Sequence, residues 1–176
     1  MSKIIILGCG SSVGTPRIDG HWGNCKRNKK NLRTRCSALI VNGSNSILID
    51  SSPDIRNQLL SNKVKNISSV LLTHKHADQT NGLFELRPFY WKNKNKINVY
   101  SDEVTIKYLK RTHGYLFKKT EDYSPILKAN LIKKKFSLGK GNEKIKFNTL
   151  MVKHGRIKST VYIFNKVAYI SDCKDY

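Results

Sequence analysis

Apolar residues along the chain come in short runs, and polar segments rich in glycine, asparagine and serine separate them. Short runs with many β-branched residues, bounded by turn formers, predict strands. We expect strands at residues 4–7, 37–41, 46–49, 70–72 and 97–100, and we expect the first and fourth to be buried. Asn42-Gly43-Ser44-Asn45 is a run of turn formers, so the second and third strands should form a hairpin.

Three segments carry helical signals. Ser51-Ser52-Pro53-Asp54 resembles a helix start, because serine and aspartate cap helices and proline suits the first turn. Ile55 and Leu59 follow at helical spacing, which predicts a short helix from residue 53 to about residue 61. Residues 81–90 are expected to be helical, and residues 104–109 are expected to form an amphipathic helix.

The last third of the chain is expected to consist mostly of strands. Apolar residues alternate with lysine at residues 144–147, which is typical of a half-buried strand. Two apolar runs, 161–164 and 167–170, flank Asn165-Lys166 and predict a second hairpin. By contrast, residues 14–35 show no regular period and are expected to form an ordered excursion. Strands interspersed with helices indicate an α/β fold built from layers.

A chain of 176 residues has the size of one domain, so residues 1–176 are expected to form a single domain. No apolar run approaches the roughly 20 positions that a membrane helix needs, and residues 1–3 lead directly into the first strand. We therefore expect neither a signal peptide nor a membrane anchor. The four cysteines, Cys9, Cys25, Cys36 and Cys173, form no CxxC pair, which favours free thiols in a reducing cytoplasm.

The formal charge of +21 favours an anionic partner, because phosphate contacts supply most of the non-specific affinity for nucleic acids. Lysine nevertheless far outnumbers arginine and occurs with abundant asparagine and isoleucine, as in Asn93-Lys94-Asn95-Lys96. This mixture indicates a general bias in composition as much as a binding surface. Solvated lysine surfaces are the simplest interpretation, and an anionic substrate or RNA is the alternative.

The most specific chemistry lies in His74, His76 and Asp78, which follow the strand predicted at residues 70–72. Alternate positions of extended backbone project to the same side, so these side chains can converge. Imidazole nitrogens and a carboxylate are ligands that borderline divalent metals accept. A lone histidine would more often be only hydrogen-bonded, but three ligand types directly after a buried strand predict a metal site.

The segment Thr73-His74-Lys75-His76-Ala77-Asp78 closely resembles the HxHxDH signature of metallo-β-lactamase-fold hydrolases. Further motifs resemble the cyclic-phosphodiesterase branch of the phosphonate pathway, and they extend over nearly the whole chain. They are Gly8-Cys9-Gly10-Ser11-Ser12-Val13-Gly14-Thr15-Pro16, Trp22-Gly23-Asn24-Cys25, Asn31-Leu32-Arg33-Thr34-Arg35-Cys36-Ser37, Ile47-Leu48-Ile49-Asp50-Ser51-Ser52-Pro53-Asp54-Ile55-Arg56 and Gly82-Leu83-Phe84-Glu85-Leu86-Arg87.

The resemblance implies an αβ/βα sandwich of two mixed sheets flanked by helices, with up to two zinc or manganese ions at the sheet edge. The metal ligands that it implies are His74, His76, Asp78, His154 and Asp172. The three histidines would bind the first ion, Asp172 would bridge both ions, and Asp78 would hold the second. Asp78 and Asp50 are the expected catalytic carboxylates, with Asp50 supporting the site by hydrogen bonding.

The chain departs from the family pattern at two places. Gln79 stands where the signature has its last histidine, and a carboxamide is a weaker ligand for transition metals than imidazole, which makes the second site doubtful. The chain also ends at Tyr176, before the further histidine of the family, so the C-terminal portion of the fold is expected to be missing. His21 and His113 offer no replacement, and Arg87 with the lysines could steer an anionic substrate.

The resemblance thus implies a metal-dependent hydrolase, a phosphodiesterase for small and also cyclic phosphate esters, in which metal-bound hydroxide attacks. Whether residues 1–176 are active by themselves is left open. One alternative is a tRNase Z-like nuclease, which the charge favours, and another is a degenerate, non-catalytic basic module that binds nucleic acid. The expected partner is a small phosphate ester, with RNA less favoured, no membrane and a homodimer allowed.

Overall fold

The computed structural model describes residues 2–174 and contains two β-sheets that pack face to face. The six strands of the larger sheet, in the order in which they lie, are β1 (Lys3–Gly8), β2 (Ser37–Asn42), β3 (Asn45–Ile49), β4 (Ser69–Leu71), β5 (Ile97–Ser101) and β6 (Leu127–Leu131). The strands of the smaller sheet, again in spatial order, are β10 (Val167–Tyr169), β9 (Ile157–Phe164), β8 (Ile145–His154) and β7 (Lys135–Leu138).

Strand direction divides the larger sheet into two parts. β1, β2 and β3 pair antiparallel, whereas β3, β4, β5 and β6 pair parallel. The described strands of the smaller sheet all pair antiparallel. Asn165 and Lys166, in the predicted turn of the last hairpin, both have positive φ, as a two-residue turn between twisted strands requires.

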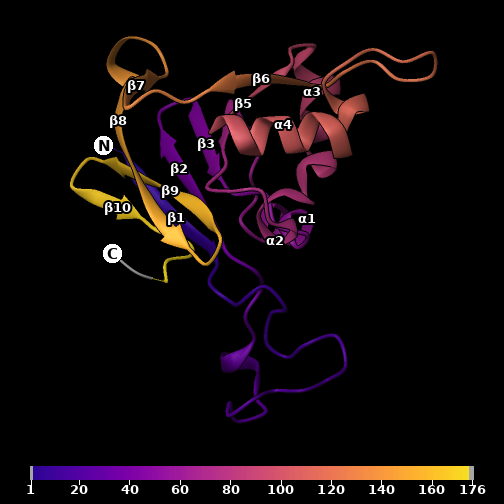
Figure 1. Ribbon diagram of the computed structural model, residues 1–176, viewed down its shortest axis with the longest axis vertical. Coiled ribbons are helices and arrows are strands. Elements are labelled where there is room, and N and C mark those ends of the chain that lie inside the picture. Colours follow the sequence, from indigo (N-terminus) through magenta and orange to yellow (C-terminus); the bar gives the residue numbers. More distant parts are fainter. Residues whose placement is uncertain (1, 175–176) are drawn as a thin grey trace.

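The helices cover the face of the larger sheet that lies away from the smaller sheet (Figure 1). The α-helices are α1 (Ile55–Ser61), α2 (Ala77–Thr80), α3 (Arg87–Asn93) and α4 (Glu103–Thr112). The 3-10 turns are η1 (Lys29–Asn31), η2 (Leu83–Leu86), η3 (Gly114–Leu116) and η4 (Gly141–Glu143). Within the described part of the chain, no helix is both long and apolar enough to cross a membrane.

Two hydrophobic layers hold this arrangement together, because successive side chains of a strand point to opposite faces. On β2, Leu39 belongs to the layer that contains Leu59 of α1, whereas Ile40 belongs to the layer that contains Phe147 of β8. All four side chains are at least 94% buried, and full burial of a residue of this size contributes about 1.5–3 kcal/mol. Tyr162 joins the sheets, since its hydroxyl donates to the carbonyl of Leu72 at 2.8 Å.

The segment between β1 and β2 leaves the sheets and returns, as Figure 1 shows. Apart from η1 it has no helix and no named strand, which agrees with the predicted ordered excursion. Isolated bridges join Thr15 to Arg33 and Gly10 to Arg35 near its base. Arg35 also forms a half-buried ion pair with Asp54 at 2.7 Å, which attaches the excursion to the start of α1.

Several sequence expectations need correction. β1 lies at the sheet edge and its strand is only half-buried, because Ile6 is 57% exposed. α1 begins at Ile55 and not at residue 53, since the Asp54 carboxylate accepts from Arg35 and forms no side-chain cap. The strand expected at residues 144–147 continues to His154. The sequence analysis did not identify β6, β7 or α2.

Candidate metal centre

The predicted site residues lie at one edge of the two sheets because each follows, or ends, a strand of the core. Asp50 follows β3, His74 and His76 follow the parallel neighbour β4, and His154 is the last residue of β8. Asp172 follows β10. A hydrogen bond from Thr160 N on β9 to the Thr73 carbonyl, 2.8 Å long, ties the two sheets together at this edge.

Three imidazole rings converge at the edge. His74 Nε2 lies 3.0 Å from His76 Nδ1, and His154 Nε2 lies 3.3 Å from the same His76 nitrogen. The ring centroids are 4.6–5.0 Å apart, and the ring planes meet at 68–75°. The rings are therefore arranged edge to face around a common point. His74 is buried in the protein, whereas His76 is exposed to solvent.

These distances match the donor set of a divalent cation. At a metal–nitrogen distance of about 2.0–2.1 Å, tetrahedral coordination places neighbouring donors about 3.3 Å apart. One ligand atom from each of His74, His76 and His154 lies within 4.8 Å of the others. The histidine cluster can thus hold a metal ion, and three imidazoles are a donor set that zinc accepts.

The two acidic residues of the predicted ligand set lie beside the histidines. Asp172 Oδ2 is 3.8 Å from His74 Nε2, close enough to reach a cation held by the cluster after a small adjustment. Asp78 is connected to Asp172 through Gln79, whose Nε2 donates to Oδ2 of Asp78 at 3.0 Å and to Oδ2 of Asp172 at 3.2 Å. The structure therefore brings all five predicted ligand residues to one place, although only the histidines form a direct cluster.

The side chain of Asp50 contacts Thr73 and makes no hydrogen bond to the three histidines within residues 2–174. The carboxylate of Asp50 is fully buried and accepts from Thr73 N at 2.8 Å and from Thr73 Oγ1 at 3.0 Å. Thr73 Oγ1 also lies 3.0 Å from His74 Nδ1 and 2.9 Å from Ser171 Oγ. Because the hydrogen of the Thr73 hydroxyl points at Asp50, Thr73 Oγ1 accepts a hydrogen bond from His74 Nδ1–H. The lone pair of His74 Nε2 is therefore left to bind a cation at the centre.

Burial sets the protonation of these groups. Burial, followed by the neighbouring imidazoles of His76 and His154, lowers the pKa of His74 to about 3. His74 is then neutral at physiological pH, as a metal ligand must be. Burial also raises the pKa of Asp50 well above its ordinary value, and the hydrogen bonds from Thr73 counteract part of that rise.

Two residues near the centre carry roles that the sequence analysis did not assign. Thr73 and Ser171 each precede a predicted ligand, and their hydroxyls meet beside Asp50. In the sequence, the available signal for these two roles was a hydroxyl residue directly before a predicted ligand, but only the tertiary contact gives each residue its role.

Cys36, also near the centre, is a thiol, because burial and then the carboxylates of Asp172 and Asp50 raise its pKa to about 11.

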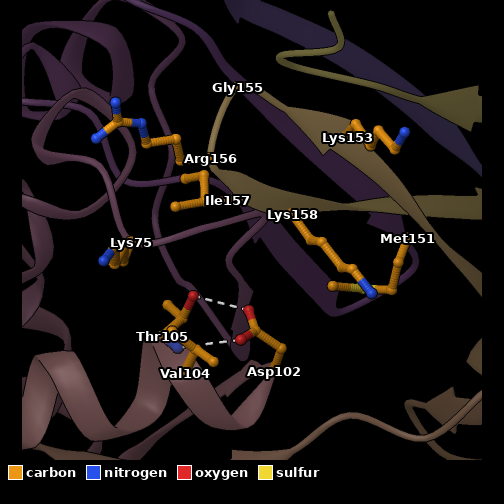
Figure 2. Close-up of a pocket in the computed structure, with 10 residues that line it drawn as sticks. All are labelled: Lys75, Asp102, Val104, Thr105, Met151, Lys153, Gly155, Arg156, Ile157 and Lys158. Atoms are coloured by element: carbon orange, nitrogen blue, oxygen red, sulfur yellow. Dashed lines mark hydrogen bonds between the residues drawn. The ribbon is translucent and has the colours of Figure 1, made fainter. Parts of the chain in front are cut away.

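A pocket of about 540 Å³ is lined in part by residues that are next to the three histidines in sequence (Figure 2). Its walls come from the HxHxD segment, the start of α4 and the β8–β9 ribbon. The basic residues that line it are Lys75, Lys153, Arg156 and Lys158. None of these four makes an ion pair within residues 2–174. The pocket is thus basic, since its one carboxylate, Asp102, accepts hydrogen bonds from Thr105 as the N-cap of α4.

Arg87, named above as a residue that could steer an anionic substrate, is packed between aromatic rings. Its guanidinium carbon lies 4.5 Å from the centroid of Phe84 and 4.6 Å from that of Trp91. Both distances are in the range of cation–π attraction. The contacts give Arg87 a structural role in η2 and α3, and the basic pocket residues lie elsewhere.

Comparisons with known proteins agree with this fold. A family model described as "Beta-lactamase superfamily domain" matches residues 45–176. The crystal structure of a diphosphatase from the PhnP family superposes with a TM-score of 0.81 at 25% identity, covering 99% of this chain and 68% of that one. Zn²⁺-bound PqqB from Methylobacterium extorquens gives a TM-score of 0.69 at 18% identity, covering 98% of this chain and 66% of that one, which shows the shared fold.

A curated relative is the octanoyltransferase of Porphyromonas gingivalis, which is 31% identical over 176 residues and 98% of this chain. The chain spans only 35% of that protein's length, so the name of the whole relative is not carried over. The residues 45–176 that the family model matches include all three histidines of the cluster, both aspartates beside it and the strands that place them. The chain therefore belongs to the beta-lactamase superfamily domain family and has the metallo-β-lactamase fold.

Proposed function

We propose that the chain carries the centre of a metal-dependent hydrolase that acts on small phosphate esters, including phosphodiesters. The observation that carries this proposal is the convergence of three imidazole nitrogens from His74, His76 and His154 on one point. These residues would hold Zn²⁺ or Mn²⁺, with Asp172 as an additional oxygen ligand. Bound there, such a cation would polarise a phosphoryl oxygen and activate water.

The surrounding residues keep the donors in place. Asp50 holds the Thr73 hydroxyl, and that hydroxyl fixes the ring and the tautomer of His74. Asp50 is thus a positioning residue, because its carboxylate reaches the centre only through Thr73. Partners of this kind typically change metal affinity or activity by about 10- to 100-fold when they are removed.

Asp78 is the carboxylate that we assign to proton transfer. Its side chain is only partly buried, and Gln79 holds one of its oxygens at 3.0 Å. Within residues 2–174 the other oxygen accepts no hydrogen bond, so it could accept a proton from an attacking water. A carboxylate placed beside the reacting atoms in this way contributes general base catalysis, typically about 10²- to 10⁴-fold.

The basic pocket supports an anionic substrate. Lys75 lies between two of the histidines in sequence, and Lys153 and Gly155 flank the third, so the same segments carry the pocket and the histidines. Val104, Met151 and Ile157 add an apolar wall. A phosphate ester with an organic group would place its charge near the lysines and its organic group against that wall.

The proposal is tested with bis(4-nitrophenyl) phosphate as a general phosphodiester, in the presence of Mn²⁺ or Zn²⁺. We expect hydrolysis that a chelator abolishes and added metal restores. His76→Ala should lower the rate by at least about 100-fold, because it removes a direct ligand. His21→Ala is the matched control, since His21 lies in the excursion, and it should leave the rate unchanged. Equal rates for the protein and His76→Ala would reject the assignment.

A further inference from the structure

Gln79 occupies an unusual position among the acidic residues of the centre. It is 1% exposed, and its Nε2 donates to one oxygen of Asp78 and one oxygen of Asp172. The backbone holds the residue on both sides, because Gln79 N donates to the His76 carbonyl at 3.1 Å and Ser51 N donates to the Gln79 carbonyl at 2.8 Å. The side chain is therefore fixed between the two carboxylates.

We propose that the carboxamide nitrogen of Gln79 takes the place of a second cation, so that the centre binds one metal ion per chain. This inference rests on the proposed function. Two neighbouring carboxylates repel each other unless positive charge or N–H donors lie between them. The amide has two hydrogens, and the two bonds supply one to each carboxylate.

The same geometry leaves no room for a bridging ion at this point. A cation shared by the two carboxylates would lie about 2.0–2.2 Å from each oxygen. The Gln79 nitrogen lies 3.0 and 3.2 Å from those same oxygens and directs its hydrogens at them. An ion could enter only if the amide left its position.

Rotating the side-chain amide of Gln79 by half a turn, so that Oε1 and Nε2 exchange places, would not create a good metal ligand. Gln79 Oε1 would then face two carboxylate oxygens, and like partial charges would replace two hydrogen bonds. In the observed orientation Oε1 is buried without a hydrogen-bond partner among residues 2–174, which is unfavourable. Two hydrogen bonds to charged acceptors offset that cost, because such bonds are stronger than those between neutral groups. The hydrogen bonds to Asp78 and Asp172 thus explain the orientation.

Asp172 gains a defined role from this arrangement. With Oδ2 held by Gln79 and located 3.8 Å from His74 Nε2, the carboxylate is directed at the histidine cluster. Its position no longer depends on a second ion. The single cation would then have three imidazoles and one carboxylate as protein ligands.

The experiment is a metal count on the purified protein after demetallation, reloading with Mn²⁺ and removal of excess ion. Mn²⁺ is chosen because the four cysteines attract it less than they attract zinc. We expect one Mn²⁺ per chain, with an electron paramagnetic resonance spectrum free of coupling between two ions. His76→Ala, measured in parallel, corrects for adventitious sites. Two ions per chain would overturn the inference and leave the proposed function intact, whereas no ion would overturn both.

A gain-of-site variant tests the role of Gln79 directly. Gln79→His replaces the amide donor with an imidazole ligand and should raise the count to two Mn²⁺ per chain. Gln79→His combined with Asp78→Asn should return it to one, because the new ion would need the Asp78 carboxylate. A count of one for Gln79→His, with the protein folded by circular dichroism, would show that another feature limits the site and would contradict the inference.

Discussion

Thr73 connects a buried carboxylate with an imidazole of the histidine cluster through one hydroxyl group. Its Oγ1 contacts Asp50, His74 Nδ1 and Ser171 Oγ within 3.0 Å, and its backbone N–H donates to Asp50 as well. The backbone of Asp50 has a φ of 59°, a conformation that aspartate tolerates better than most residues. The hydroxyl oxygen of Thr73 therefore determines that His74 directs Nε2, and not Nδ1, at the centre.

Thr73→Val tests this connection at nearly constant volume. The variant keeps the backbone bond to Asp50 but leaves His74 Nδ1 and one side of Asp50 without a partner. We expect metal affinity to fall by about 10- to 100-fold, measured by isothermal titration calorimetry. Thr149→Val on β8 is the matched control, because its hydroxyl bonds only to the Lys133 carbonyl. Affinity unchanged in Thr73→Val would show that the hydroxyl does not position the ligand.

The residues of the site were more predictable than their contacts. Spacing alone marked His74, His76 and Asp78, because an HxHxD segment after a buried strand has few other uses. His154 and Asp172 came only from the family resemblance, since a single histidine or aspartate near a strand end carries no pattern. The hydrogen bonds of Gln79 could not be predicted, because they depend on residues 93 positions apart in sequence meeting in the fold.

At the scale of elements, strands with a continuous apolar run were predicted well, and short strands of mixed composition were not. β2 and β3 have continuous apolar runs, and the structure confirms them and their hairpin. β6 and β7 are only five and four residues long, and each mixes apolar residues with polar ones and one lysine, so their apolar signal is weak. β8 extends beyond its predicted end because pairing with β9 continues to His154, and the exposed apolar residues Leu150 and Met151 hide the alternation there.

Phe147 tests the packing of the smaller sheet against the larger one. It is 1% exposed and lies between Phe136 and Phe164 in the layer that joins the sheets. Phe147→Ala should lower the free energy of unfolding by about 3–5 kcal/mol, measured by chemical denaturation. Leu150→Ala on the same strand is the control, because Leu150 is 52% exposed and should change stability by about 0.5 kcal/mol or less. Similar losses in both variants would contradict the assigned core.

At the scale of the whole molecule, part of the large positive charge gathers in one pocket. Four basic residues that lack ion pairs in the described chain line one pocket, on segments that also carry the three histidines. A cleft lined by one sign of charge concentrates ligands of the opposite sign. The remaining lysines are spread over exposed surfaces, which agrees with the bias in composition seen in the sequence.

Lys153→Glu with Lys158→Glu tests the pocket. Reversing two charges should raise KM for an anionic phosphodiester by about tenfold or more at low salt, with a smaller change in kcat. The effect should shrink as ionic strength rises and the Debye length shortens. Lys29→Glu with Lys30→Glu, in the excursion, gives the same change in net charge and serves as the control. Equal shifts in both double variants would assign the effect to net charge and not to the pocket.

The central claim is that His74, His76 and His154 bind one cation together. Its most direct test is a crystal structure of the protein loaded with Zn²⁺, with the ion located by anomalous scattering. We predict a peak about 2.0–2.1 Å from His74 Nε2, His76 Nδ1 and His154 Nε2. A peak bound elsewhere, or three rings that turn apart with no ion between them, would contradict the account.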